Sequence, residues 1–224
     1  MKIIAMVPGR YGSERFKKKN FSNLHGSPLM SYALNSSIES KVFDKVILNG
    51  DSDEFIKIAN SHNVEFYKRP SYLGTSEARS DDVVYDFIKK FGGDIIAWVN
   101  PICPLMTSKT VERVIKDFID NDYDSAITGR KIFSHTNVNN SPVNYDLNNK
   151  FAKTQDLNPI FLFSYSVMIW KTSSFLKKYE KDRSAFIFGN FGEIEVDFFS
   201  SLTVKYEYDL KIIKELYPLV YNDR

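Results

Sequence analysis

The sequence is poor in the residues that build disulfide scaffolds and zinc sites. It contains one cysteine, Cys103, and three histidines, His25, His62 and His135, whose spacing does not match a zinc site. It also lacks any run that approaches the roughly 18 apolar residues of a membrane-spanning helix. Because the apolar N-terminal segment gives way at once to polar residues, unlike a secretory signal, we expect the chain to stay in the cytoplasm, away from membranes.

An excess of charge of either sign is absent as well. There are 30 Lys and Arg residues against 28 Asp and Glu, for a formal net charge of +2. Proteins that bind nucleic acid are typically much more basic, so we expect no nucleic-acid partner. With 224 residues, of which 43% are hydrophobic, the chain fits one large globular domain over 1–224.

Short β-rich runs alternate with amphipathic segments in the first half of the chain. The expected strands are 3–7, 45–48, 64–67, 94–99 and 125–128, and the expected helices are 28–39, 53–62, 80–91 and one capped by Ser108. Because these strands are apolar on both faces, the alternation predicts an α/β fold. We expect an open, mostly parallel, Rossmann-like sheet covered by helices.

The second half of the chain is less regular. From Lys131 to about Lys150 the sequence turns to Asn, Ser and Thr, which indicates an excursion from the fold. Two strands over 159–163 and 166–170 are expected next, and a helix over about 207–217 is expected last. The apolar residues expected to form the inner face of that helix are Tyr208, Ile212, Ile213 and Leu216.

The loop after the first strand carries the clearest functional signal, because ligands of parallel α/β sheets bind beyond the carboxyl ends of the strands. It combines glycines that let the backbone approach a ligand, a hydroxyl donor, and cations that can converge on phosphate oxygens. These residues are Gly9, Gly12, Ser13, Arg10, Arg15 and Lys19. The loop matches neither the P-loop nor the dinucleotide fingerprint. It predicts a triphosphate cradle, and from composition alone a solvated basic loop is the alternative.

The order of residues in this loop is similar to (I/V)-P-A-R-G-G-S-K-R-x-x-x-K-N. That motif opens the CMP-N-acylneuraminate cytidylyltransferases, which make CMP-sialic acids and related CMP-nonulosonates on a nucleotide-diphospho-sugar transferase fold. The matching residues are Pro8, Arg10, Gly12, Ser13, Arg15, Lys19 and Asn20. Further segments that match family motifs, in family order, are 26–29, 43–46, 51–54, 69–73 and 100–105. The chain therefore resembles that family throughout its first half.

The resemblance implies a CTP-dependent transfer, in which a hydroxyl of an acidic sugar attacks the α-phosphate of CTP and gives a CMP-sugar and pyrophosphate. Such a transfer depends mostly on positioning and on neutralising charge. The implied catalytic residues are Arg10 and Lys19. The implied CTP-binding residues are Pro8, Gly9, Gly12, Ser13, Arg15, Asn20, Arg69, Asn100 and Cys103. One alternative is a different acidic acceptor, such as Kdo or a phosphonate- or phosphate-bearing acid. Another is a nucleotide-binding homologue without catalysis.

Three positions have competing interpretations. Arg69 is implied to satisfy the O2 acceptor of cytosine, and the alternative is a surface arginine held ahead of a proline. Cys103 is expected to be a packing or pocket thiol and not a nucleophile, because no motif places a base beside it. Asp51 is expected either to cap the following helix through its neighbours Ser52 and Asp53, or to contact the ligand.

The implied metal site is where this chain departs from the family. Members carry D-x-D before the last helix, where it holds Mg²⁺, whereas Thr203 and Lys205 stand at those two positions here. Magnesium prefers oxygen ligands, so the resemblance implies Mg²⁺ but leaves its ligands unknown. Asp197 is a candidate if the alignment shifts, although Glu195 and Asp197 also fit a polar and apolar alternation along a strand. Lys205 is expected to place a cation near the phosphates or to bind the acceptor's carboxylate.

The resemblance also implies a homodimer, in which an excursion from one subunit helps to close the partner's active site. Residues 131–186 are the candidate excursion. The residues that would form its contact surface, or else belong to the core, are Phe161, Leu162, Phe163 and Ile169. Trp98 and Trp170 lie in apolar runs and are expected in the core.

Overall fold

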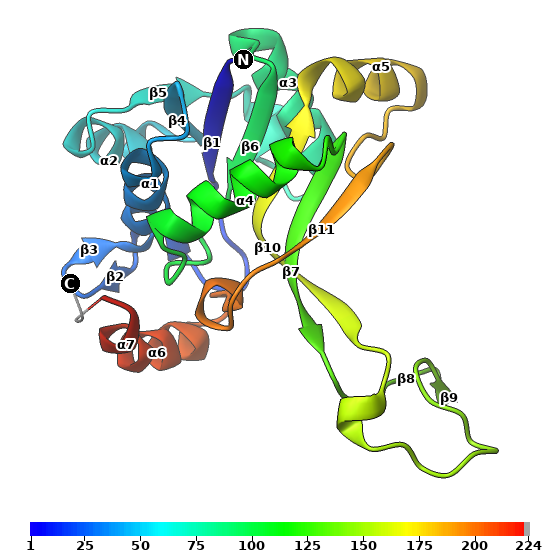
Figure 1. Cartoon of the computed structure of the whole chain (residues 1–224). Coiled ribbons are helices and arrows are strands. Elements are labelled where there is room, and N and C mark those ends of the chain that lie inside the picture. The colour runs from blue at the N-terminus through cyan, green and yellow to red at the C-terminus, as the bar shows by residue number, and fades with distance from the viewer. Residues whose placement is uncertain (222–224) are drawn as a thin grey trace.

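The computed structural model describes residues 1–221. The strands of its main sheet are β1 (Ile3–Gly9), β4 (Lys45–Gly50), β5 (Glu65–Lys68), β6 (Ile95–Val99), β7 (Ser125–Ile132), β10 (Ile160–Lys171) and β11 (Phe191–Glu195). They lie side by side in the order β11-β7-β10-β6-β1-β4-β5 (Figure 1). β10 runs antiparallel to β6 and β7, and the other neighbouring pairs are parallel. The structure confirms the predicted α/β fold with a mostly parallel sheet.

Helices cover both faces of this sheet. They are α1 (Leu29–Ser40), α2 (Ile56–Ser61), α3 (Ser80–Phe91), α4 (Ser108–Asp120), α5 (Thr172–Asp182), α6 (Glu207–Leu216) and α7 (Pro218–Tyr221). In β1, Ala5 and Val7 join an apolar cluster with α1, α2 and α4, whereas Ile4 and Met6 join another with α3 and α5. Alternate side chains of one strand therefore pack on two helical layers. Each helix within residues 1–221 is too short or too polar to span a bilayer.

Shorter elements connect the main ones. Two-residue strands pair as β2 (Asn23–Leu24) with β3 (Ser27–Pro28) and as β8 (Asn137–Val138) with β9 (Ser141–Pro142). The 3-10 helices are η1 (Lys19–Phe21), η2 (Asp53–Phe55), η3 (Ser71–Gly74), η4 (Thr154–Asp156) and η5 (Phe199–Ser201).

The region around β10 differs from the prediction. The two strands expected over 159–163 and 166–170 are one strand, with an irregular register between Phe163 and Met168. Tyr165 lies in that irregular stretch with a left-handed backbone, at φ 58°. The following helix α5 was not expected, because its Lys-rich segment begins directly at the end of the strand.

Two helices differ in detail from the prediction. α4 is capped by Thr107, whose Oγ1 accepts a hydrogen bond from Thr110 N at 3.2 Å, and not by Ser108. On α6 the predicted inner face is only partly right. Tyr208 and Ile212 are 59% and 57% exposed. The buried residues of α6 are Leu210 and Ile213. Apolar residues occur on two sides of this helix, and only packing selects the buried side.

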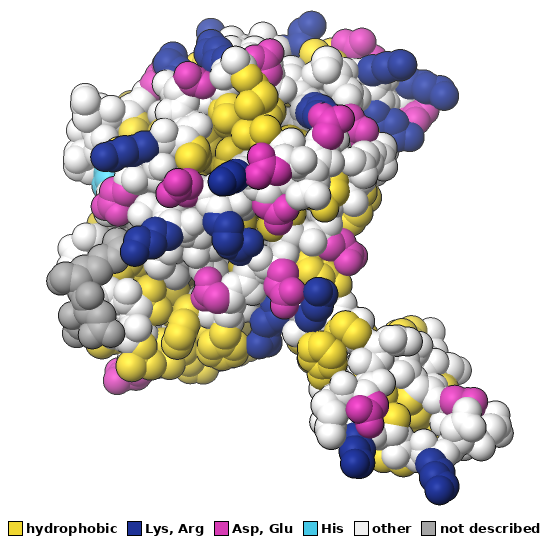
Figure 2. Space-filling model, viewed as in Figure 1, with side chains coloured by type: hydrophobic (Ala, Val, Ile, Leu, Met, Phe, Trp, Pro, Cys, Tyr) yellow, Lys and Arg dark blue, Asp and Glu magenta, His cyan; other side chains and the backbone are white. Residues whose placement is uncertain are grey.

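Residues 133–159, which we call the arm, project from the body between the far ends of β7 and β10 (Figure 1). The projecting part is shorter than the predicted 131–186, because β10 pairs with β6 in the main sheet and α5 packs on it. Ile169 is a buried residue of that sheet and so belongs to the core, as does Trp170. Figure 2 shows the arm as a separate lobe with apolar side chains gathered at its base. Large exposed apolar residues of the arm are Phe133, Val138, Val143, Leu147 and Phe151.

Candidate active site

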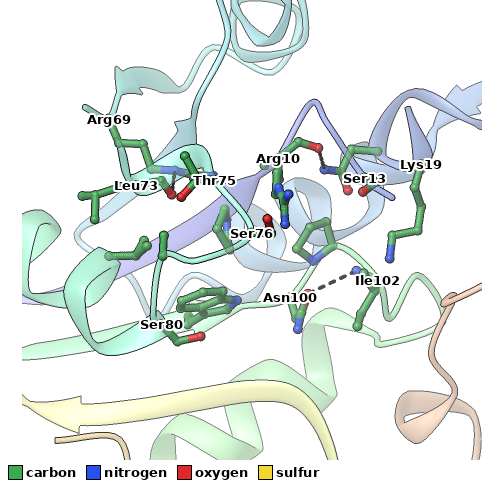
Figure 3. Close-up of a pocket in the computed structure, with 17 residues that line it drawn as sticks. Arg10, Ser13, Lys19, Arg69, Leu73, Thr75, Ser76, Ser80, Asn100 and Ile102 are labelled. Carbon is green, nitrogen blue, oxygen red and sulfur yellow. Dashed lines mark hydrogen bonds between the residues drawn. The ribbon is translucent and has the colours of Figure 1, made fainter. Parts of the chain in front are cut away.

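A cavity of about 230 Å³ opens at the carboxyl ends of β1 and β6. Its walls come from the first loop, residues 10–20, and from the segments 69–83 and 98–102 (Figure 3). These segments are far apart in the sequence and meet because β1 lies between β4 and β6 in the sheet. Ligands of parallel α/β sheets bind at this edge.

Most of the predicted site residues line this cavity. They are Pro8, Gly9, Arg10, Ser13, Lys19, Asn20, Arg69 and Asn100. In Figure 3 Arg10, Ser13 and Lys19 face it from the first loop, while Asn100 and Ile102 lie across from them. Arg15 lines an adjoining cavity instead. Within the described chain, Gly12 and Cys103 line neither of these two cavities.

Hydrogen bonds from other residues fix the first loop in place. Asp51 Oδ1 accepts a hydrogen bond from Tyr11 N at 2.9 Å, and Asn20 Nδ2 donates to the Arg10 carbonyl at 3.2 Å. The side chain of Ser52, and not that of Asp51, caps the following 3-10 helix. The cap therefore comes from the neighbour Ser52, as one of the two expectations held, and Asp51 does not line the cavity. Its carboxylate positions the loop.

Gly9 is required for packing as well as for its place at the cavity. A Cβ atom at Gly9 would lie 2.6 Å from the ring of Phe55 and 2.7 Å from Met30 Cε, distances at which atoms overlap. A Cβ atom at Gly12 would meet no described atom within 4 Å. Gly9 therefore lets β1 end tightly against its neighbours, whereas Gly12 borders open space.

Arg69 is buried beside the cavity, with 6% of the residue exposed, so the surface interpretation is wrong. Its Nε donates to the Leu73 carbonyl at 3.1 Å, and its Nη1 donates to the Asn49 carbonyl at 2.9 Å. Its Nη2 lies 3.8 Å from Asp51 Oδ2. Burial lowers the pKa of this guanidinium, and the Asp51 carboxylate opposes that shift. Arg69 thus braces the cavity wall, and its contact with cytosine stays a prediction.

A second cavity, of about 220 Å³, adjoins the first and is partly lined by the same residues. Its lining consists of Arg10, Ser13, Glu14, Arg15, Phe16, Lys19, Ile102 and Lys205. We call it the cation pocket, because its lining combines several Lys and Arg side chains with a single acidic one.

Lys19 lines both cavities. Its Nζ donates a hydrogen bond to the Val204 carbonyl at 3.0 Å. Burial lowers the pKa of this ammonium, and the positive charge of Arg15 lowers it further. A partly desolvated ammonium beside other cations is poorly compensated, so an anionic ligand at this place is strongly favoured.

Two residues differ from what their sequence context indicated. Cys103 is 1% exposed, and burial raises the pKa of its thiol to about 12. It is an inert packing residue, and its predicted contact with CTP is not supported. Trp98 was expected in the core but is only partly buried and lines the first cavity. Its position near the carboxyl end of β6, two residues before Asn100, is the sequence feature that could have placed it at the cavity.

Other lining residues have no motif that marks them. They are Thr75, Ser76, Ala78 and Ser80, which follow Arg69 along the chain. The sequence did not reveal them, because small residues at and before a helix start carry no distinctive spacing.

The residues proposed for a metal site do not come together. Asp197 Oδ1 accepts a hydrogen bond from Ser200 N at 2.9 Å, and its Oδ2 accepts one from Ser200 Oγ at 2.6 Å. Glu195 Oε2 lies 3.3 Å from Lys131 Nζ. Residues 1–221 contain no group of three or more His, Cys, Asp and Glu side chains that could hold a metal ion. With Lys205 in the cation pocket, these residues do not fit a magnesium ion held by the protein.

The chain is similar in sequence to known cytidylyltransferases. The chain is 39% identical over 88 residues to the N-acylneuraminate cytidylyltransferase of Escherichia coli, a match that covers 39% of this chain and 20% of that protein. It is 25% identical over 195 residues to the pseudaminic acid cytidylyltransferase of Campylobacter jejuni, covering 84% of this chain and 78% of that protein. The chain thus spans about a fifth of the first relative and most of the second.

A solved structure shares the fold. The CMP:2-keto-3-deoxy-manno-octonic acid synthetase in complex with CTP superposes with a TM-score of 0.75 at 13% identity, over 98% of this chain and 99% of that one. The model of the cytidylyltransferase family matches residues 4–209, which include the first loop and both cavities. With nearly the whole chain matched, this protein belongs to the cytidylyltransferase family.

Proposed function

We propose that this protein is a CTP-dependent cytidylyltransferase that activates an acidic sugar of the nonulosonic class, for polysaccharide or glycoprotein assembly. The observation that carries the proposal is the convergence of Arg10, Ser13 and Lys19 with Arg69 and Asn100 on one cavity at the carboxyl ends of the strands. The names of the E. coli and C. jejuni relatives support an acceptor of this class. A cytoplasmic location stays a prediction from the sequence.

In the proposed reaction, an acceptor hydroxyl oxygen bonds to the α-phosphorus of CTP. The bond from that phosphorus to the bridging oxygen breaks, pyrophosphate leaves with the electron pair, and the hydroxyl proton is released to solvent. Negative charge grows on the leaving pyrophosphate, so cations already in place stabilise the transition state. Arg10 can grip two phosphate oxygens at once, whereas Lys19 supplies a compact charge. No step of this scheme uses a metal held by the protein.

We propose in addition that the protein acts as a homodimer joined through the arm. The support is physical: Val138, Leu147 and Phe151 are 59%, 71% and 74% exposed on a segment that projects from the body. Apolar side chains also gather at the base of the arm (Figure 2), and contiguous exposed apolar patches mark protein–protein interaction sites. Light scattering after size exclusion should give twice the monomer mass at micromolar concentration, and a monomer would contradict the proposal.

The activity is tested by measuring pyrophosphate release. CTP should give pyrophosphate only when an acidic sugar is supplied, and ATP, GTP and UTP should give none. The acceptors should include sialic acid, pseudaminic acid and Kdo, because one relative over 54% of this chain is a 3-deoxy-manno-octulosonate cytidylyltransferase. Turnover with Kdo alone would replace the proposed acceptor. CTP binding without turnover on any acceptor would favour a homologue that has lost catalysis.

A further inference from the structure

The cation pocket draws its charge from both ends of the chain. Arg10, Arg15 and Lys19 come from the first loop, whereas Lys205 comes from the segment before α6. The acidic lining residue, Glu14, lies 3.3 Å from Arg10 Nη2, with 70% of its side chain exposed. Within residues 1–221, the other three cations form no ion pair. The pocket therefore carries an excess of positive charge.

The backbone on either side of Lys205 is fixed against the rest of the site. Asp209 Oδ2 accepts a hydrogen bond from Lys205 N at 2.8 Å. Val204 N donates to the Ile102 carbonyl at 2.8 Å, and the Val204 carbonyl accepts the bond from Lys19 Nζ. The Val204 side chain is fully buried in an apolar cluster that includes α6. The fold thus holds this lysine at the pocket although its side chain is exposed.

Arg10 offers a donor that the protein does not use. Its Nε is buried and has no hydrogen-bond partner among the described residues. A buried donor without a partner costs free energy, and an oxygen-rich ligand at this place would remove that cost. Because the neighbouring side chains are positive, the ligand that fits best is a compact polyanion.

We propose that the cation pocket binds the β- and γ-phosphates of CTP, and later the free pyrophosphate, through protein cations alone, with Lys205 taking the place of a metal ion held by the protein. The identity of the nucleotide rests on the function proposed above. The pocket shares the lining residues Arg10, Ser13, Lys19 and Ile102 with the first cavity, so one extended nucleotide bound along these residues can occupy both. A lysine ammonium is a compact charge beside the forked donors of Arg10 and Arg15, and together they can surround a diphosphate.

The test is calorimetry on the full chain with pyrophosphate, CTP and CMP, each measured in EDTA and in Mg²⁺. Wild-type protein should bind pyrophosphate and CTP in EDTA, with Kd values within about threefold of those in Mg²⁺. Lys205→Ala should weaken both ligands by about tenfold or more and leave CMP unchanged, since CMP has no β-phosphate. Lys211→Ala is the matched control, because Lys211 is 74% exposed on α6 and pairs with Glu207 at 3.6 Å.

Three outcomes separate this inference from the proposed function. CMP binding without pyrophosphate binding in EDTA would overturn the inference and leave the proposed function standing. Pyrophosphate binding that depends on Lys205, without CMP binding, would support the pocket as a diphosphate site and contradict the proposed function. Equal weakening of CMP and CTP by Lys205→Ala would overturn the inference, because it would indicate a general disturbance of the site. Thermal melting of each variant shows that it is folded.

Discussion

The cation pocket has two walls that are built in different ways. The first loop continues directly from β1 and is held in place by hydrogen bonds with the side chains of Asp51 and Asn20. The opposite wall, around Lys205, depends on burial of Val204 and on the bonds of Asp209 at the start of α6. One wall follows from a motif in continuous sequence, whereas the other exists only because a distant segment packs beside it. The resemblance already indicated a cation at Lys205, but only the packing of that segment brings it to the same pocket as the first loop.

The same contrast explains why Asp197 does not reach the site. Asp197 was a candidate because it is acidic and lies close to Lys205 in sequence. Its carboxylate instead accepts hydrogen bonds from Ser200 in η5, and Asp197 lines neither cavity. Sequence proximity at this end of the chain says little about the site, because the chain turns at η5 before it reaches the pocket.

The largest expected effect concerns the first wall. Arg10→Ala should lower kcat/KM for CTP by about 100-fold or more, because it removes a forked donor from the charge that grows in the transition state. Arg10→Lys should recover part of that loss, since it keeps the charge without the fork. The control is Lys17→Ala, an exposed residue of the same loop that lines neither cavity. If Arg10→Ala behaved like this control, the first loop would not be the dominant wall.

A smaller loss of CTP binding is expected when the cations of the first loop are kept but Asp51, which holds the loop in place, is removed. Asp51→Ala frees Tyr11 N and removes the charge 3.8 Å from Arg69. We expect the KM for CTP to rise about tenfold and the free energy of unfolding to fall by about 1–3 kcal/mol, the cost of leaving buried groups unpaired. Steady-state kinetics and urea denaturation measure the two effects. Asp53→Ala, which breaks only the surface pair with Lys68, should change neither quantity appreciably.

Removal of Asp209, which holds the second wall in place, should reduce CTP binding less than removal of Asp51. Asp209→Ala removes the acceptor for Lys205 N and Tyr206 N at the start of α6. Loss of such a cap costs about 1 kcal/mol, so we expect a modest drop in melting temperature and a rise of a few fold in the KM for CTP. Glu207→Ala is the control on the same helix turn. A larger loss for Asp209→Ala than for Asp51→Ala would reverse the ranking of the two walls.

The smallest expected effect is a pH dependence of CTP affinity that comes from Lys19, whose Nζ joins the first loop to Val204 in the second wall. Burial and the charge of Arg15 lower the pKa of Lys19 below its ordinary 10.5, and the protonated form is the one that binds phosphate. CTP affinity should therefore fall as alkaline pH passes the lowered pKa, with proton uptake on binding. Between that pKa and 10.5 the unfolded state binds more protons, so the stability of the free protein should rise with pH in this window.

Calorimetry in buffers of different ionisation enthalpy measures the proton uptake. Lys19→Arg should abolish it, because an arginine stays protonated throughout this range. If proton uptake persisted in Lys19→Arg, another group would be the one that titrates, and the prediction for Lys19 would be wrong.

The parts of the fold that could be predicted are those with strong local patterns. Strands buried on both faces leave continuous apolar runs, as in β1 and β6, and these were recognised. The Lys-rich α5 and the orientation of α6 were missed or misjudged, because their polar and apolar residues fit more than one arrangement. Trp98 was misjudged for a related reason: an apolar residue at the end of a buried strand can face either core or cavity.

By itself the sequence determined the α/β alternation and the chemistry of the first loop, because both are carried by neighbouring residues whose spacing is set by backbone geometry. Only the tertiary structure decided that Arg69 is buried, that Asp51 is an anchor, and that Lys205 reaches the same pocket as Lys19. The physical reason is that these roles depend on which distant groups satisfy a charge or a hydrogen bond. Which distant groups meet is decided when the apolar layers pack, and no local sequence pattern shows it.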